Sequence, residues 1–517
     1  MSGALLPGRA GPAVRQLTWP AAWTAPALTA VCIGLWALLS AAINTGQFAD
    51  NIEEFVWAQS FESGYWKHPP LPSWMLRTAI QVFGFWSGWT YVLAAICFIG
   101  ATFFTWRVAL RLGGERVAAI AVLLQGLHLG FSWRAQEYNH NTVLVLFSGM
   151  TVLAVMRALE TQRRREWVAA GLCAGLAVLS KYQALVLIAG IALALVTMGA
   201  LKDKRTRAGC LLAALVAMLV LTPHIAHLLK GHTDSIRYAL HNFQAVDPLA
   251  ALRRVIAYSF NQLRFHAPML LAIGLVVLGG RGVFRNTAGS PLDEASAATL
   301  APEQVRAWMI GLVAWPIGFM VAIALVGGMK LHAQWGLPAF QFLVIAIALR
   351  LARGLPSLKL RALARAVLMV HLFNAVIFSW LALGREPTGS RVDRAYPARQ
   401  LTEAVLKDWQ HLTACPLKFI VGPSFEAGIV SVYSGNYPQV LEQGDFSKSP
   451  WIDPERLRQA GSVVLGYAGD DAPLAHSLMV PLRGKRSTHR VSWSIVAPGA
   501  PCEATTDRPG RTNNDSP

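Results

Sequence analysis

The chain has 517 residues, with 46 Lys and Arg against 28 Asp and Glu, which gives a formal net charge of +18. Only 14% of the residues are charged and 54% are hydrophobic, whereas soluble proteins average about 25% charged residues. This composition excludes a soluble enzyme, a disordered chain, collagen and a soluble nucleic-acid-binding protein, so no nucleic acid is expected as a partner.

Apolar runs of near 20 residues recur along most of the chain, and about 20 apolar residues in a helix cross a ~30 Å hydrocarbon core. The sequence therefore predicts a mainly α fold, a polytopic bundle of transmembrane helices. The first run shows no small-residue cleavage pattern and is expected to stay as a membrane anchor. About eleven spans are predicted, at residues 22–43, 88–110, 117–133, 141–158, 167–180, 183–200, 210–229, 266–280, 309–328, 335–352 and 364–384.

The basic residues indicate which loops lie inside. Bursts of Lys and Arg occupy alternate loops, as in Arg163-Arg164-Arg165, while the opposite loops hold few, with Arg134, Lys181 and Lys330 nearly alone in theirs. Cytoplasmic loops carry such an excess of positive charge. We therefore expect a multi-pass membrane protein with residues 1–21 in the cytoplasm.

The same rule places two long loops, 44–87 and 230–264, on the periplasmic side of a transmembrane module at 22–384. Both loops mix aromatic and polar residues, which favours helices lying in the membrane interface. Residues 286–304 are small and polar and are expected to form a cytoplasmic linker.

The composition changes after the last predicted span. A helix-like stretch at 401–409 and strand-like runs at 417–421 and 462–465 predict a small periplasmic α/β domain over 385–504. The polar end, 505–517, is expected to be disordered. Cys415 and Cys502 lie in this part, either as a disulfide or as two unrelated thiols.

The first outer loop holds the residues with the clearest chemical potential. Asp50 follows the first span by a few residues, which puts a carboxylate at the membrane surface, where a lipid phosphate also lies. Glu53 shares a helix face with Asp50 at this spacing, so the two are acid/base candidates; the alternative is a solvated helix face. Lys67 and His68 place cations before a rigid Pro-Pro turn.

At this point the sequence resembles a known family. Asp50 followed by Gly64-Tyr-Trp-Lys-His-Pro-Pro-Leu-Pro-Ser-Trp74 is similar to the first outer loop of GT-C glycosyltransferases of the protein mannosyltransferase and aminoarabinose transferase type (glycosyltransferase family 39/83). The resemblance continues in order through Arg134-Ala-Gln-Glu-Tyr-Asn-His-Asn141, Leu179-Ser-Lys-Tyr182 and Lys330-Leu-His-Ala-Gln-Trp-Gly-Leu-Pro338. It covers most of residues 20–384.

The resemblance implies transfer of a sugar from a polyprenyl-phosphate carrier to an acceptor at the outer face of the membrane. It makes Asp50 the catalytic residue, with Glu53 as a second candidate. The residues expected to meet the donor phosphate are the cations of the matched motifs, Lys67, His68, Arg134, Lys181 and His332. The residues expected to contact the acceptor or the sugar are Trp57, Tyr65 and Asn141.

The sequence departs from the family where many members have an acidic residue after the third span, since this chain has Asn139, His140 and Asn141 there. No metal ligand is assigned. His68 and His140 form a possible pair of metal ligands. No cofactor is required by these motifs, and a divalent metal ion stays an open alternative.

The predicted function is a membrane glycosyltransferase with an undecaprenyl-phosphate-linked donor and a periplasm-facing acceptor, either lipid A or lipopolysaccharide or another envelope glycan. Its expected partners are this donor, the lipid or glycan acceptor and membrane lipids. Two alternatives remain, a protein O-mannosyltransferase-like enzyme and a flippase or transporter of lipid-linked sugars. Transporters usually show repeated halves, and no internal repeat is visible here, which favours an enzyme.

Overall fold

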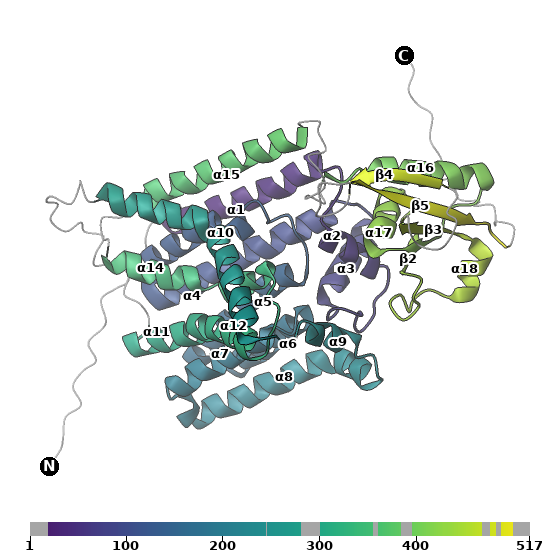
Figure 1. The fold of residues 1–517 in the computed structure, drawn as a ribbon. Helices are drawn as coiled ribbons and strands as arrows, with labels where there is room; N and C mark the ends of the chain where they lie inside the picture. The colour runs from purple at the N-terminus through teal and green to yellow at the C-terminus, as the bar shows by residue number, and fades with distance from the viewer. Residues whose placement is uncertain are drawn as a thin grey trace, which may run out of the picture. The chain divides into compact units, whose positions relative to one another are not determined.

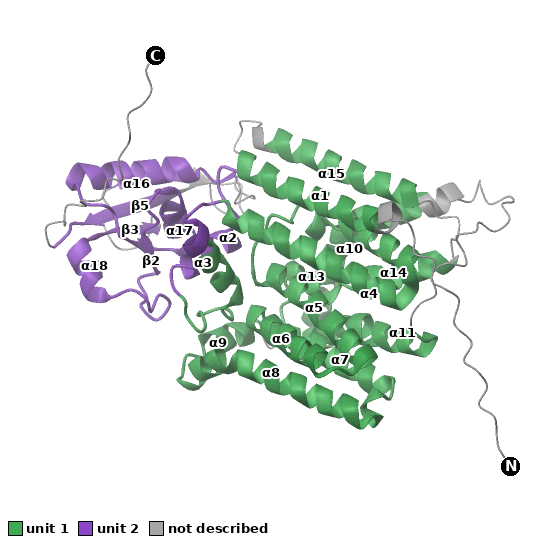
Figure 2. Cartoon of the chain, turned by 180° about the vertical axis from the view of Figure 1, so that it is seen from behind, with its two compact units in different colours: residues 1–43, 61–79, 88–384 green, residues 44–60, 80–87, 385–517 purple. Residues whose placement is uncertain are grey.

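The computed structural model describes residues 19–243, 246–280, 300–354, 360–383, 395–467, 476–481 and 488–499. Nearly all of the predicted cytoplasmic segment 1–21, most of the predicted linker and the tail at 505–517 lie outside these residues. The chain forms two compact units (Figure 2). Unit 1 comprises residues 1–43, 61–79 and 88–384, and unit 2 comprises 44–60, 80–87 and 385–517. The domain boundaries expected from the sequence stay a prediction.

Unit 1 is a bundle of apolar helices (Figure 1). Within hydrocarbon, a helix satisfies every backbone N–H and C=O group internally, which is why apolar runs of this length become helices. The helices are α1 (Trp19–Ile43), α3 (Leu71–Phe83, in unit 1 through Ala79), α4 (Trp89–Leu127), α5 (His140–Thr161), α6 (Arg164–Ser180), α7 (Ala184–Thr197), α8 (Lys204–Leu229), α9 (Asp234–His241), α10 (Pro248–Gly280), α11 (Pro302–Met309), α12 (Trp315–Val326), α13 (Gly336–Ala339), α14 (Leu343–Gly354) and α15 (Leu360–Leu383).

The helices identify a multi-pass membrane protein. Among the described residues, six helices are long and apolar enough to cross a membrane, and a bent pair, Ala333–Ala339 with Leu343–Arg353 at 58°, would make a seventh span. Helix α4 covers two of the predicted spans, and Gly114, at φ +76°, separates it into two helical segments at the predicted loop. The expected number of eleven crossings stays a prediction.

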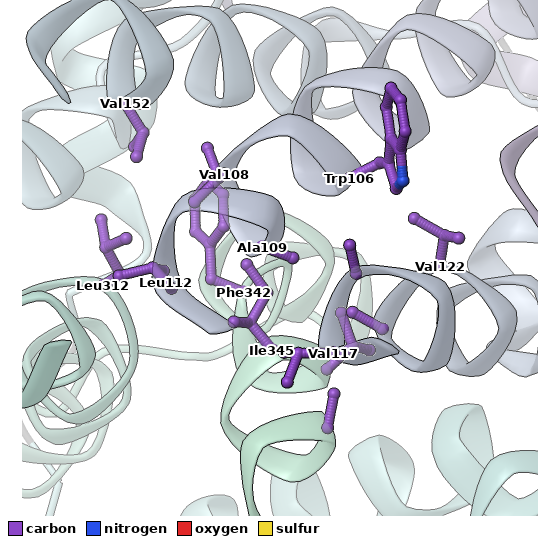
Figure 3. Packing of buried hydrophobic residues seen from close by; sticks show 14 of the residues in the cluster. Trp106, Val108, Ala109, Leu112, Val117, Val122, Val152, Leu312, Phe342 and Ile345 are labelled. Atoms are coloured by element: carbon purple, nitrogen blue, oxygen red, sulfur yellow. The ribbon is translucent and has the colours of Figure 1, made fainter. Parts of the chain in front are cut away.

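The core of unit 1 forms where the two segments of α4 meet α5, the turn before α12, and α14 (Figure 3). Val108, Leu112 and Val122 of α4 are buried there together with Val152 of α5 and Ile345 of α14. Helices in a bilayer are held together mainly by close van der Waals packing, and a well-packed side chain makes many weak contacts that add up.

Glycines allow the closest approach between helices. A Cβ atom on Gly190 of α7 would lie 2.1 Å from the carbonyl oxygen of Gly311, and a Cβ on Gly311 would lie 2.2 Å from that of Gly190. Gly311 belongs to a π-helical turn, Ile310–Ala314, between α11 and α12. Small residues at such crossings let two backbones touch, so α7 packs directly on this turn.

Contacts between loops of unit 1 occur within each of the two sets that the sequence assigns to the two faces. Two loops assigned to the outer face are joined by the hydrogen bond from Tyr138 to the Pro72 carbonyl, and two more by that from the Lys330 amide to the Asn242 carbonyl. Two loops assigned to the inner face are joined by the ion pair Arg111–Glu160. The orientation itself stays a prediction.

Unit 2 contains a five-stranded mixed sheet in the order β2-β1-β3-β5-β4. The strand β1 pairs in parallel with β2 and β3, while β5 is antiparallel to β3 and β4. The predicted helix at 401–409 and strands at 417–421 and 462–465 are confirmed. The elements are α16 (Ala398–Leu412), β1 (Phe419–Gly422), α17 (Ser424–Tyr433), β2 (Gln439–Glu442), α18 (Pro454–Ala460), β3 (Ser462–Tyr467), β4 (His476–Pro481) and β5 (Thr488–Val496).

A segment of the first outer loop is part of unit 2. Helix α2 (Ala49–Trp57) packs on α17 so tightly that a Cβ on Gly428 would lie 2.4 Å from the Ile52 side chain. The Trp57 indole N–H donates to Glu442 at 3.1 Å. Cys415 of this unit is disulfide-bonded, and the four other described cysteines are free. Cys502 lies outside the described residues, so its pairing with Cys415 stays a prediction.

Candidate active site

Three chain segments meet at the end of unit 1 where the predicted outer loops gather. They are the loop before α3, the start of α5 and the end of α6. Asn139 caps α5, its side chain accepting from the amides of Asn141 and Thr142 at 2.9 and 3.1 Å. Lys181 is the residue that ends α6. In the loop, the Tyr65 amide donates to the carbonyl of His68 at 3.2 Å, which closes the turn that carries Lys67.

Lys181 is held by contacts from two other segments. Its ammonium group donates to the Asn141 side-chain oxygen at 2.6 Å and lies 4.9 Å from the centre of the Trp335 ring. The residue is buried, with 9% of its surface exposed. A buried lysine costs free energy unless its charge meets hydrogen-bond partners. The Asn141 oxygen and the face of the Trp335 ring are two of the groups that compensate this cost.

Lys67 approaches the same region from the loop before α3. Its ammonium group lies 4.5 Å from the Trp66 ring centre and 5.7 Å from that of Tyr238. Attraction between a cation and an aromatic face steadies such a side chain without neutralising it. Both lysines therefore lie against aromatic rings. Two of these aromatic residues, Trp335 and Tyr238, were not among the candidate site residues predicted from the sequence.

His68 stacks on His140, with ring centroids 3.6 Å apart and planes inclined by 35°. The amide of Asn141 lies 3.3 Å from His140 Nε2, and the Tyr238 ring meets His68 edge-on at 5.5 Å. Burial first, and then the charges of Lys181 and Lys67, hold the pKa of His68 well below its usual value. The imidazole of His68 is accordingly neutral near pH 7.

A small pocket, with a cavity volume of about 20 Å³, adjoins this cluster. Asn141 belongs to both, since it lines the pocket and also binds Lys181. Inside the pocket Arg134 pairs with Glu137, whose other oxygen accepts from Gln334 at 3.4 Å. Its lining combines polar groups with aromatic and aliphatic ones, namely Phe98, Gly130, Arg134, Glu137, Asn139, Asn141, Thr142, Phe265, Gln334 and Leu337.

The residues predicted in unit 1 therefore divide into three groups. Lys67, His68, Asn141 and Lys181 come together in one cluster. Arg134 lies in the adjoining pocket, and Tyr65 is buried and supports the loop through its backbone. His332 is exposed; its ring lies 5.0 Å from that of Trp335 at an angle of 54°, and it contacts the Asn242 side chain at 3.2 Å. The roles assigned to all of them stay predictions.

Asp50, Glu53 and Trp57 belong to α2 of unit 2. Asp50 is in the first turn of this helix, where the helix dipole favours a negative charge. Asp50 and Glu53 are partly exposed, and their spacing places them on one helix face. The Trp57 ring is buried within unit 2 and its indole is engaged by Glu442. Its proposed contact with the acceptor stays a prediction.

Sequence reasoning missed a second polar chain in unit 1. The Tyr182 hydroxyl lies 2.8 Å from His224 Nε2 and 2.9 Å from the Ser235 hydroxyl, and His224 Nδ1 lies 2.7 Å from the Ser63 carbonyl. Burial raises the pKa of Tyr182. The chain ties the loop before α3 to α8 and α9.

No group of three or more His, Cys, Asp or Glu side chains suited to a metal ion occurs among the residues that the structure describes.

Comparison with known proteins agrees with this architecture. The family model of dolichyl-phosphate-mannose-protein mannosyltransferases matches residues 67–227. The chain is 24% identical over 305 residues to the lipid A galacturonosyltransferase RgtD of Rhizobium johnstonii (strain DSM 114642 / LMG 32736 / 3841). This match covers 57% of the chain and spans only 59% of the length of that relative.

The solved structures include ArnT from Cupriavidus metallidurans bound to undecaprenyl phosphate. It is similar at a TM-score of 0.51 and 15% sequence identity, over 90% of this chain and 97% of ArnT. A likeness at this identity shows the fold, a membrane helical bundle with a smaller additional unit. The helical-bundle fold expected from the sequence is thereby confirmed.

Proposed function

We propose that this chain, which belongs to the GT-C glycosyltransferase superfamily, transfers a sugar from a polyprenyl-phosphate donor to a lipid acceptor at the outer face of a bacterial inner membrane. The observation that carries the proposal is the cluster of Lys67, Lys181 and His68 at the end of the bundle. Two ammonium groups held by aromatic rings suit a phosphate at the membrane surface.

The relatives support a lipid acceptor. RgtD is named as a lipid A transferase, and ArnT was solved with undecaprenyl phosphate. We therefore favour undecaprenyl phosphate as the carrier and lipid A, or another part of the lipopolysaccharide, as the acceptor. The family model names protein mannosyltransferases, so a protein O-glycosyltransferase is the second candidate.

The chemistry needs few groups because a phosphate is a good leaving group. The bond between the anomeric carbon and the phosphate oxygen breaks, its electron pair stays on the phosphate, and the acceptor oxygen bonds to the carbon. Lys67 and Lys181 stabilise the charge that develops on the phosphate. Asp50 accepts the proton of an acceptor hydroxyl. We expect Asn141, which binds the Lys181 ammonium group, to contact the sugar.

The test is mass spectrometry of lipid A, core glycan and envelope glycoproteins from cells that hold the wild-type protein, the Asp50→Asn variant or no protein. We expect a glycan mass that depends on the wild-type chain and is lost in Asp50→Asn, which removes the base and keeps the size. Glu455→Gln, a change of an exposed carboxylate in α18, is the matched control and should retain the product.

Two results would overturn the proposal. A product of unchanged amount in Asp50→Asn would remove the role of Asp50 as base. An unchanged glycan profile in cells without the protein, together with lipid-linked sugar accumulating on the cytoplasmic face, would replace the transferase by a flippase. A mass lost from glycoproteins alone would favour the second candidate.

A further inference from the structure

The hydrogen-bonded chain through Tyr182 has no role in the function proposed so far. The Tyr182 hydroxyl lies 2.8 Å from His224 Nε2 and 2.9 Å from the Ser235 hydroxyl, and His224 Nδ1 lies 2.7 Å from the Ser63 carbonyl. His224 and Ser235 are both buried. The chain therefore links four segments of unit 1, namely the loop before α3, the turn after α6, the end of α8 and the start of α9.

The chemistry of these groups gives the chain a direction. A carbonyl oxygen only accepts, so His224 Nδ1 carries a hydrogen and donates it to Ser63. In the neutral imidazole Nε2 then accepts from the Tyr182 hydroxyl, whose oxygen accepts from Ser235. His224 thus holds the loop with one ring nitrogen and Tyr182 with the other.

The ends of the chain lead to the two lysines of the candidate active site. Tyr182 directly follows Lys181 in the sequence. Ser235 lies one helical turn before Tyr238 on α9, and the Tyr238 ring lies 5.7 Å from the Lys67 ammonium group. The carbonyl that His224 binds belongs to the same loop as Lys67. The chain is therefore placed to set the position of one lysine relative to the other.

The backbone of the loop also packs against α8. A Cβ on Gly64 would lie 3.0 Å from His224 Nδ1 and 2.8 Å from the ring of His227. Any side chain at this position would displace one of the two rings, and glycine permits the close approach. Because the loop touches His224 through both Ser63 and Gly64, a shift of this imidazole would shift the loop.

We propose that His224 is a positioning residue of the donor site. Through its two hydrogen bonds it fixes the loop of Lys67 relative to Lys181, so that both ammonium groups meet the same phosphate. The inference rests on the proposed function, in which the two lysines hold the donor phosphate. Groups that act together on one anion bind it well when their geometry is set in advance. His224 itself touches neither the donor nor the reacting atoms.

Titration calorimetry with farnesyl phosphate, a short polyprenyl monoester, tests this role on the full-length protein in detergent. Tyr182→Phe removes one hydroxyl and keeps the ring, and it should raise the dissociation constant about fivefold. Tyr258→Phe is the matched control and should bind like the wild type. It removes a buried hydroxyl of α10 that has no hydrogen-bond partner among the residues that the structure describes.

Two substitutions of His224 separate positioning from packing. His224→Leu fills the space and removes both hydrogen bonds, and it should weaken binding about tenfold. His224→Asn keeps an N–H donor near the place of Nδ1, so it can still reach the Ser63 carbonyl and should weaken binding only about threefold. A packing role predicts the opposite order, because asparagine is smaller and polar and leaves a cavity.

The outcomes separate this inference from the function on which it rests. A wild-type protein that does not bind farnesyl phosphate would count against the phosphate site itself. Normal binding by the wild type together with equal affinities in Tyr182→Phe and Tyr258→Phe, or with His224→Asn no better than His224→Leu, would overturn the positioning role alone. Should His224→Leu fail to fold, the comparison of the two tyrosine variants still decides the question.

Discussion

The Lys181 ammonium group donates to the side-chain oxygen of Asn141 at 2.6 Å, across 40 residues of sequence. The bond joins the end of α6 to the first turn of α5. Because an amide carries no formal charge, Asn141 fixes the direction of the ammonium group without neutralising it. A carboxylate at the same position would fix the lysine and also form an ion pair with it, which an asparagine does not.

Replacing Asn141 by Asp should therefore weaken the binding of polyprenyl phosphate by tenfold or more. Hydrogen bonds to charged groups contribute about 1.5–3 kcal/mol, and roughly 1.4 kcal/mol changes a dissociation constant tenfold. Calorimetry on the purified protein measures the change. Asn261→Asp, which adds the same charge on α10, is the control, and equal losses in the two variants would refute a local effect.

Close backbone contact between Gly190 and Gly311 predicts that Gly190→Ala destabilises the bundle. The new methyl group would meet the Gly311 carbonyl, and overpacking of this kind costs about 1–3 kcal/mol of the free energy of unfolding. Thermal unfolding in detergent should show a lowered midpoint. Gly274→Ala in α10 has open space around the added methyl and should leave the midpoint unchanged or slightly raised; a loss equal to that of Gly190→Ala would contradict the contact.

The lowered pKa of His68 predicts a dependence of stability on pH. The unfolded state binds a proton at the usual histidine pKa near 6.5, while the folded state binds it only at lower pH. This contribution to stability is therefore full above about pH 6.5 and is lost as the pH falls below it, by up to roughly 1.4 kcal/mol per pH unit.

Unfolding of the wild-type protein and of His68→Asn, followed between pH 5 and pH 8, checks this sign. The difference in midpoint between the two proteins should change in favour of the variant as the pH falls below 6.5, since the variant has no proton to bind at this position. A constant difference over the whole range would show that protonation of His68 is not coupled to unfolding.

The disulfide at Cys415 predicts that reduction weakens unit 2. Loss of a native disulfide in a small domain costs about 2–5 kcal/mol. Thermal unfolding with and without dithiothreitol should therefore differ for the wild-type protein and coincide for Cys415→Ser. Cys210→Ser, at a free cysteine in α8, should keep the response of the wild type. Insensitivity of the wild type to the reductant would contradict the prediction.

Hydropathy and charge were sufficient to predict the helical bundle. In lipid, a long apolar run forms a helix because a helix satisfies its backbone N–H and C=O groups internally. The order of motifs selected Lys67, His68, Asn141 and Lys181, which lie together in one cluster, and their roles stay predictions. What local sequence does not contain is the set of contacts between distant segments. The stack of His140 on His68 and the ring of Trp335 beside Lys181 depend on how three loops meet, and neither residue stands in a pattern that reports its neighbour.

Local sequence also does not show that α2 packs within unit 2, because this contact joins segments far apart in the chain. The sequence of 44–60 indicates an amphipathic helix near a membrane surface, but its apolar face is covered by α17, more than 360 residues later in the chain. A reading of the first outer loop by itself has no means of finding that partner. The two predicted strands of the C-terminal part were recognisable because each is a short apolar run followed by glycine.

The hydrogen bond between Trp57 and Glu442 joins residues 385 positions apart. It therefore forms only late in biosynthesis. At ~5–20 residues per second a ribosome needs roughly 20–80 s to make the intervening chain. During that interval Ile52, Phe55 and Trp57 have emerged without the strand and helix that later bury them. The nascent protein must therefore keep an unfinished hydrophobic surface from aggregating while most of its membrane helices are still being inserted, and maturation of unit 2 is the last event in making the molecule.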